Sequence, residues 1–263
     1  MPGRIPRVTK TEALVLRHRR LGDADRIVTL LTPGRGKIDA VAKGALRPRS
    51  KLAGHLEPPT LVELVLAHGR NMDIVTGAQT VDGFAGLRDD LDRLSVAMYL
   101  AELSDRFTVE HAEARSVYEL LRAALLRLAR GDGSHLVTRS FELALLEATG
   151  FRPQWHLCIV CGKPVQADAV AWSALGGGVV CGDCRPVHPE AKDIDARTLK
   201  VLRALQAGPY EDAARIRLSP RLAAALERVM HELMRSVAER ELKGQQFVAE
   251  ARRAGAAAAR SGP

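Results

Sequence analysis

Hydrophobic residues are concentrated in five short runs within residues 8–82. The runs are rich in β-branched residues, which favour strands. They are Thr11–Leu16, Ile27–Thr32, Lys37–Ala42, Leu61–Ala67 and Met72–Val81. Turn-forming residues separate them, including a tight connection at Pro33–Gly36 and a long one over Gly44–Pro59. Five short strands within about 75 residues predict a small closed barrel of the OB or SH3-like kind.

From Phe84 the hydrophobic positions fall three to five residues apart, which is the spacing of amphipathic helices. The pattern predicts three helices, separated by Glu110–Glu113 and by Gly131–Ser134, with Ser134 as the N-cap of the third. The helical spacing returns over Asp195–Gln206, and Ser219–Pro220 opens a long helix that reaches about Lys243. The chain is therefore expected to begin as a β unit and to continue as a mainly helical one.

Length and composition fit a globular protein of more than one unit. The 263 residues are 46% hydrophobic and 27% charged, which is ordinary for a folded chain. No apolar run approaches the ~18 residues that a membrane span needs, and the start has no apolar signal region, so we expect a cytoplasmic protein. The predicted domains are 1–82, a helical domain over 83–250 with a cysteine module at about 151–190, and a flexible tail over 251–263.

All four cysteines lie in one segment, as two C-x-x-C pairs separated by nineteen residues: Cys158, Cys161, Cys181 and Cys184. This spacing is typical of a structural zinc site, because each pair presents two thiolates to one edge of a tetrahedron. Four cysteines would fill the coordination shell of one structural Zn²⁺ per chain and leave no position for a substrate. Disulfides and a redox pair are the alternatives, and His156 is an alternative ligand.

The formal net charge is +8 and the pI is near 9.7, which favours polyanionic partners. The excess of basic residues is concentrated at the two ends of the chain. At the N-terminal end, residues 1–82 hold 14 basic and 8 acidic residues. The candidate DNA-binding residues in this unit are Arg17, Arg19, Arg20, Arg35, Lys37, Lys43, Arg47, Arg49 and Lys51. Residues 1–82 contain no Phe, Tyr or Trp, so a nucleic acid would be bound mainly through its phosphates, with strong salt dependence.

Motifs of catalysis are missing from the sequence. Gly34–Ile38 only faintly resembles a phosphate loop, because Ile38 stands where a Ser or Thr would meet Mg²⁺. The acidic residues Asp89, Asp90 and Asp92 fall in an early helical turn, where the helix dipole favours negative charge. The sequence therefore predicts that the protein is not an enzyme.

Two segments together resemble the RecO family of bacterial recombination mediators and DNA repair proteins. The first runs from Leu21 to Thr32 and continues through Gly36–Lys37, Ala42–Ala45 and the basic Arg47–Lys51. The second is the cysteine segment, preceded by Leu145–Pro153. The resemblance implies an α+β protein in which an N-terminal five-stranded OB-type β-barrel is followed by a mainly helical domain with a four-cysteine zinc-ribbon-like module.

The resemblance also implies a function in the RecF pathway of homologous recombination. Such a protein binds single- and double-stranded DNA, anneals complementary strands, and with RecR helps load RecA onto DNA coated by single-strand-binding protein. It implies a nucleoid-associated location in a bacterial cytoplasm. The family's DNA-contacting surface corresponds here to Lys37, Lys43 and the Arg47–Lys51 loop.

Two alternatives in other functional classes remain open at the level of sequence. One is a zinc-ribbon adaptor that binds RNA or a polymerase, and the other is a metalloenzyme with an open zinc position.

Within the long final helix, Arg221, Arg228 and Arg235 recur every seven residues beside apolar positions. They form a candidate site for the acidic tail of single-strand-binding protein. The alternative is a solvated face with pairs such as Glu232 and Arg235.

Overall fold

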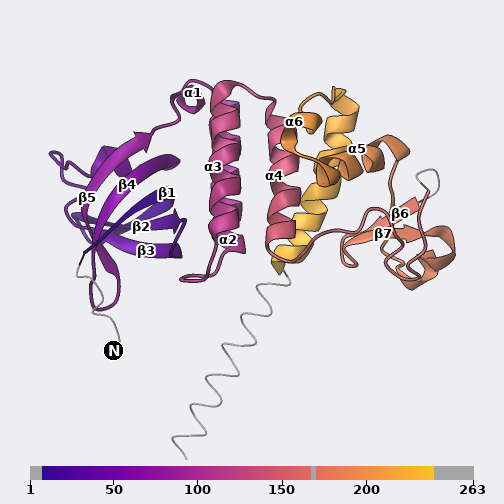
Figure 1. Cartoon of the computed structure of the whole chain (residues 1–263), viewed down its shortest axis with the longest axis horizontal. Helices are drawn as coiled ribbons and strands as arrows, with labels where there is room; N and C mark the ends of the chain where they lie inside the picture. The colour runs from indigo at the N-terminus through magenta and orange to yellow at the C-terminus, as the bar shows by residue number, and fades with distance from the viewer. Residues whose placement is uncertain (1–7, 167–169, 240–263) are drawn as a thin grey trace, which may run out of the picture. The chain divides into compact units, whose positions relative to one another are not determined.

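The computed structural model describes residues 8–166 and 170–239, and it divides into two compact units. Among these described residues, the first unit comprises residues 8–150 and 209–215, and the second comprises residues 151–166, 170–208 and 216–239 (Figure 1). The division into domains at residue 82 stays a prediction, and the predicted tail over 251–263 lies outside the described residues.

The first unit begins with a closed barrel of five strands in the order β1-β2-β3-β5-β4. The strands are β1 (Val8–Leu21), β2 (Asp25–Thr32), β3 (Gly36–Ala42), β4 (Thr60–Ala67) and β5 (Asp73–Asp82). All neighbours are antiparallel except β3 and β5, which are parallel. The barrel confirms the predicted OB-type architecture, and each predicted strand has its counterpart.

Strand alternation explains the barrel core. Along β3, Ile38, Ala40 and Ala42 are buried while the residues between them are partly exposed, so one face of the strand points inwards. Strand β1 is longer than predicted, because it continues beyond Leu16 to Leu21 in register with β2. The residues Arg17–Arg20 are polar on both faces of the strand, so no hydrophobic run marks this part of β1.

Helices α1 (Ala85–Arg88), α2 (Leu91–Phe107), α3 (Arg115–Arg130) and α4 (Ser134–Ala148) follow the barrel. Asp90 is the N-cap of α2 and accepts from the Arg93 N–H, so this carboxylate lies at the start of the helix, where the helix dipole was expected to favour it. The predicted N-cap at Ser134 is wrong: Gly133 holds that position, and the Ser134 hydroxyl donates to Asp92 instead. A short helix that the sequence did not predict, α6 (Tyr210–Ala213), also belongs to this unit.

The second unit contains a small sheet in the order β7-β6-β8 and two longer helices. Its elements are β6 (Val170–Ser173), β7 (Gly178–Cys181), the 3-10 helix η2 (Gly182–Val187), β8 (Lys192–Asp193), α5 (Ala196–Ala207) and a C-terminal helix over residues 220–239. The turn of the antiparallel β6–β7 hairpin contains Gly177, which has a φ of +72°. The predicted end of the C-terminal helix near Lys243 lies outside the described residues.

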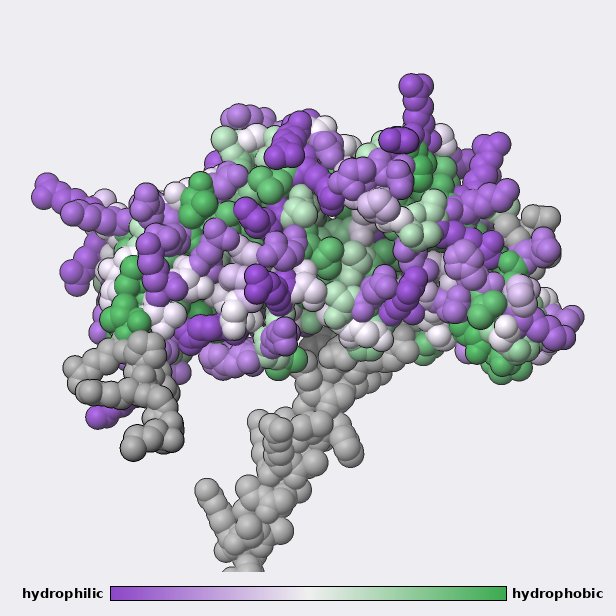
Figure 2. Space-filling model, in the orientation of Figure 1, coloured by the Kyte–Doolittle hydropathy of each residue, from purple (hydrophilic) through white to green (hydrophobic). Residues whose placement is uncertain are grey.

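No helix among the described residues is long and apolar enough to cross a membrane. Hydrophilic side chains cover most of the face seen in Figure 2, and hydrophobic ones form only small patches there.

Candidate metal centre and nucleic-acid surface

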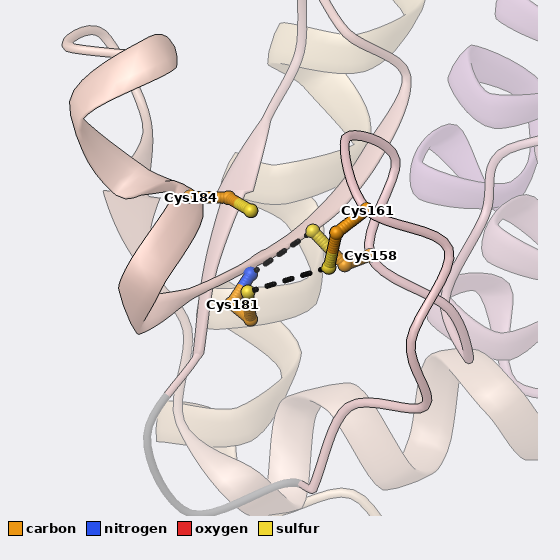
Figure 3. Close-up of side chains that lie close together, drawn as sticks. All are labelled: Cys158, Cys161, Cys181 and Cys184. Carbon is orange, nitrogen blue, oxygen red and sulfur yellow. Dashed lines mark hydrogen bonds between the residues drawn. The ribbon is translucent and has the colours of Figure 1, made fainter.

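The four cysteine sulfurs of the second unit lie within 4.8 Å of one another. Cys158 and Cys161 come from one loop, Cys181 ends β7 and Cys184 lies in η2 (Figure 3). A tetrahedron of sulfurs about 2.3 Å from a zinc ion has edges of about 3.8 Å. The Sγ atoms of Cys161 and Cys181 are 3.8 Å apart, so the cluster fits a four-sulfur metal site.

Local backbone geometry builds the first half of this cluster. The Gly162 N–H donates to the Cys158 carbonyl over 2.9 Å, and Gly162 has a φ of +70°, which closes a tight turn around the C-x-x-C pair. The Cys181 N–H in turn points at the Cys158 sulfur, 3.4 Å away. The two cysteine pairs are distant in sequence, and this geometry places their sulfur atoms around one point.

The pKa values of two of the sulfurs are shifted in opposite directions. Cys158 is only 2% exposed. Burial raises the pKa of its thiol, but N–H groups from Cys181, Cys161 and Val160 outweigh burial and lower the pKa to about 6. The hydrogen bond of the Cys184 thiol to Cys181 raises the pKa of Cys184 to about 12. A divalent cation would hold all four as thiolates, which is the usual state of such ligands.

The alternatives to a metal site can be compared with the same geometry. All four cysteines are free, and a separation of 3.8 Å is far longer than the ~2.0 Å of a disulfide. The cluster of ligand atoms found among the described residues consists of cysteines alone and does not include His156.

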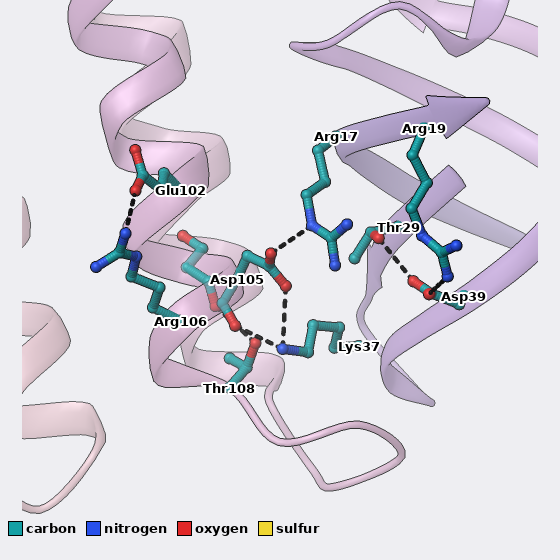
Figure 4. A network of polar contacts seen from close by, with 10 residues as sticks. Arg17, Arg19, Thr29, Lys37, Asp39, Glu102, Asp105, Arg106 and Thr108 are labelled. Carbon is teal, nitrogen blue, oxygen red and sulfur yellow. Dashed lines mark hydrogen bonds and ion pairs between the residues drawn. The ribbon is translucent and has the colours of Figure 1, made fainter. Parts of the chain in front are cut away.

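Four of the nine candidate DNA-binding residues are engaged by carboxylates of the first unit. Arg17 and Lys37 both bind Asp105 near the end of α2, at 2.6 Å and 3.0 Å (Figure 4). Arg19 lies 3.5 Å from Asp39. Arg35 binds Asp73 at 2.6 Å.

The Asp105 contacts join the barrel to the helices. The Lys37 ammonium also donates to the Asp105 backbone carbonyl, over 2.5 Å, and its side chain is only 17% exposed. Burial would raise the pKa of Asp105, but the hydrogen bonds from Arg17 and Lys37 outweigh it and hold the pKa below its usual value. The Asp105 carboxylate is therefore ionised at neutral pH, and Lys37 serves as much to attach α2 as to supply surface charge.

The other five candidates are exposed: Arg20, Lys43, Arg47, Arg49 and Lys51. Within residues 8–166 and 170–239, none of these five forms an ion pair. Arg20 lies in the β1 segment that leads to the β1–β2 turn, and the other four lie in the loop between β3 and β4. We call these five residues the free cations.

Carboxylates decide which cations remain available, and no sequence motif indicated these carboxylates. Asp105 was not singled out, and neither was Glu57, which binds Arg26 over 2.5 Å and His18 over 3.0 Å at the end of the β3–β4 loop. Nothing in the local sequence marks either residue, because their partners come from other elements.

The cationic face predicted on the C-terminal helix borders a cavity of about 280 Å³. Trp172 and Leu175 contribute its apolar part. Arg235 lines the cavity together with three glutamates, Glu190, Glu232 and Glu239. Glu232 pairs with Lys192 rather than with Arg235, and Arg235 lies 3.7 Å from Glu239. This mixed charge favours the solvated-face interpretation over a site for an acidic peptide.

Comparison with known proteins agrees with the resemblance seen in the sequence. Residues 7–84 match the family described as "Recombination protein O N terminal", and residues 88–246 match "Recombination protein O C terminal". A protein named "DNA repair protein RecO" from Roseiflexus sp. (strain RS-1) is 39% identical over 94% of this chain and 87% of its own length.

Proteins of the same name from two other bacteria are similar. The Dehalococcoides mccartyi (strain CBDB1) protein is 34% identical over 90% of this chain and 94% of its own length. The Heliobacterium modesticaldum (strain ATCC 51547 / Ice1) protein is 39% identical over 90% of this chain and 88% of its own length. Both family models belong to the same family and together match most of the chain, and the protein belongs to the RecO family of DNA repair proteins.

Proposed function

We propose that this protein is a recombination mediator that binds DNA through the free cations of its barrel and anneals complementary strands. The observation that carries the proposal is a set of five exposed cations, unpaired among the described residues, on a barrel of a RecO-family protein. Four of these cations lie on the β3–β4 loop and one near the end of β1, and their position supports a DNA-binding surface on this side of the barrel.

The chemistry of this surface favours phosphate contacts over base contacts. Stacking on aromatic side chains contributes ~1 to 3 kcal/mol per base in single-strand binders. The barrel sequence contains no Phe, Tyr or Trp, so its binding would be indifferent to base sequence and would accept both single and double strands. Cations that neutralise phosphates also lower the repulsion between two approaching strands, which promotes annealing.

The proposed partners follow from family membership. They are RecR, a single-strand-binding protein that coats the substrate, and indirectly RecA, which is loaded onto the DNA. Annealing and loading of this kind need no nucleotide hydrolysis by the mediator itself, and the proposed role is therefore not enzymatic.

The four cysteines would hold one structural zinc ion in the second unit. The ion would supply cross-linking between the Cys158–Cys161 turn and the β7–η2 segment, and so stabilise the fold. Four sulfur ligands complete a tetrahedral shell, which leaves the ion without a reactive position.

The test is an annealing reaction without ATP. Two complementary oligonucleotides, each coated with the cognate single-strand-binding protein, are mixed with the protein across a salt titration, and duplex formation is followed by fluorescence quenching. Salt-sensitive acceleration by the folded, zinc-loaded protein is expected. Failure to accelerate annealing at any salt concentration would refute the proposed annealing function.

A further inference from the structure

The β3–β4 loop, which carries four of the free cations, is anchored to the β1–β2 hairpin at its beginning. The Gly44 N–H donates to the Asp25 carboxylate over 2.7 Å. The Leu46 N–H donates to the Ala24 carbonyl over 2.9 Å. These bonds fix the first turn of the loop beside the hairpin that carries Arg20.

The same loop is anchored at its other end by Glu57. The Glu57 carboxylate accepts from Arg26 on β2 over 2.5 Å and lies 3.0 Å from His18 Nε2 on β1. Burial alone would raise the pKa of Glu57, but the hydrogen bonds from Arg26 and His18 lower it. One ionised carboxylate therefore ties the loop to two neighbouring strands.

Buried side chains attach the loop to the barrel core near both ends, and Leu52 packs against the same core from its middle. Ala45 and Leu56 are part of the barrel core. The His55 ring also bonds to Thr80 of β5, whose N–H lies 3.2 Å from His55 Nδ1. The exposed cations are consequently carried on a loop whose two ends and core side are fixed.

We propose that Glu57 and Asp25 are positioning residues for DNA binding: their carboxylates hold the β3–β4 loop so that its cations and Arg20 form one phosphate-binding surface. The proposal rests on the proposed binding of DNA by this surface. A loop fixed in advance loses less conformational entropy when it binds, which favours tighter binding.

The sign of the effect separates positioning from simple electrostatics. A carboxylate near a phosphate-binding surface repels DNA, so electrostatics alone predicts tighter binding when Glu57 is neutralised. Positioning predicts the opposite, because the freed loop would no longer present its cations together. Asp23 provides a matched control: it lies in the β1–β2 turn close to Arg20, is exposed, and has no hydrogen bond or ion pair within the described part of the chain.

The experiment measures the affinity of the full chain for a labelled duplex by fluorescence anisotropy across a salt titration. For Glu57→Ala we expect a loss of affinity of about 3- to 10-fold at low salt, and a salt slope less steep by about 1, as if one phosphate contact were lost. Asp23→Asn, which removes the same charge, should bind as tightly as the wild type or more tightly. Hydrogen exchange at residues 43–57 should rise in Glu57→Ala and not in Asp23→Asn. Equal or tighter binding by Glu57→Ala, with an unchanged salt slope, would overturn the proposal.

A second pair of variants keeps the test decisive if Glu57→Ala does not fold. In Asp25→Asn the side-chain oxygen can still accept from the Gly44 N–H, whereas Asp25→Ala cannot accept it. Asp25→Asn should retain the wild-type salt slope, and Asp25→Ala should lose part of it. The same slope in both would contradict positioning. The proposed function fails separately if Lys43→Gln with Arg47→Gln leaves DNA binding unchanged; a lost slope in that variant, with normal slopes in the carboxylate variants, would refute positioning alone.

Discussion

Replacing Lys43 and Arg47 by glutamine should reduce the salt dependence of DNA binding by an amount that follows from the number of free cations. For duplex DNA, the slope of log affinity against log salt is about −0.9 for each phosphate neutralised. If each free cation meets one phosphate, the wild-type slope is about −4.5, and a rise from 50 to 200 mM salt lowers the affinity about 500-fold. Without Lys43 and Arg47 the slope becomes about −2.7, and the same rise in salt costs only about 40-fold.

A matched control removes two cations that are already paired. Arg17→Gln with Lys37→Gln changes the net charge by the same amount but affects residues that bind Asp105. We expect this variant to keep the slope of the wild type and to lose stability in urea. Affinities would be measured by anisotropy at five or more salt concentrations, with circular dichroism as the check on folding. If the control loses as much slope as the loop variant, ion pairing does not decide which cations contact DNA and the reasoning is refuted.

Three further outcomes test other parts of the structure. Cys158→Ser should lower both zinc content and melting temperature, because metal affinity is folding energy; loss of zinc with unchanged melting would contradict a structural ion. Asp105→Asn should lower the free energy of unfolding by about 1 to 2 kcal/mol at pH 7, measured in urea, since it weakens two charge-assisted contacts at a partly exposed site. Because the pKa of Asp105 is lower in the folded protein than in the unfolded chain, its contribution is complete above the unfolded value near 4 and is lost as the pH falls through the folded value; a destabilisation that persists at the lowest pH would contradict this origin. Gly36→Ala should destabilise the protein, because Gly36 has a φ of +64° and an added Cβ would lie 1.8 Å from the Ala112 carbonyl oxygen. A melting temperature equal to that of the wild type would show that the backbone at Ala112 moves aside without cost.

The sequence predicted those features that depend on local pattern. Apolar, β-branched runs predicted the five barrel strands, and the C-x-x-C spacing predicted the cluster of four sulfurs. Predictions from the sequence were wrong or incomplete where the local pattern carries no signal for the element that forms. Residues Arg17–Arg20 of β1 are polar on both faces of the strand. Helix α6 has only four residues, too few to display a helical period. At α4, a glycine took the N-cap position beside a serine that has the better capping side chain, because the Ser134 hydroxyl is used by Asp92.

The candidate site was predicted only in part for a related reason. The sequence located the nine cations, but the carboxylates that engage four of them are distant along the chain. Arg19, Arg35 and Arg17 reach partners 20, 38 and 88 residues away, in β3, β5 and α2. Such pairs form only when the barrel closes and packs against the helices, so no local sequence motif indicates them.

Whether a cation is paired with a carboxylate decides how the charge of the chain acts on a nucleic acid. The net charge of +8 is a sum over the whole chain, whereas interactions between exposed charges are screened beyond about 8 Å at physiological salt. A phosphate near the barrel therefore responds to the cations within its immediate reach. Arg17 and Lys37 both bind the Asp105 carboxylate there, while Lys43 and Arg47 form no ion pair with any residue that the structure describes. Affinity for DNA should accordingly follow the number of unpaired cations on the β3–β4 loop and the order of that loop, and should be insensitive to substitutions elsewhere that change the net charge equally.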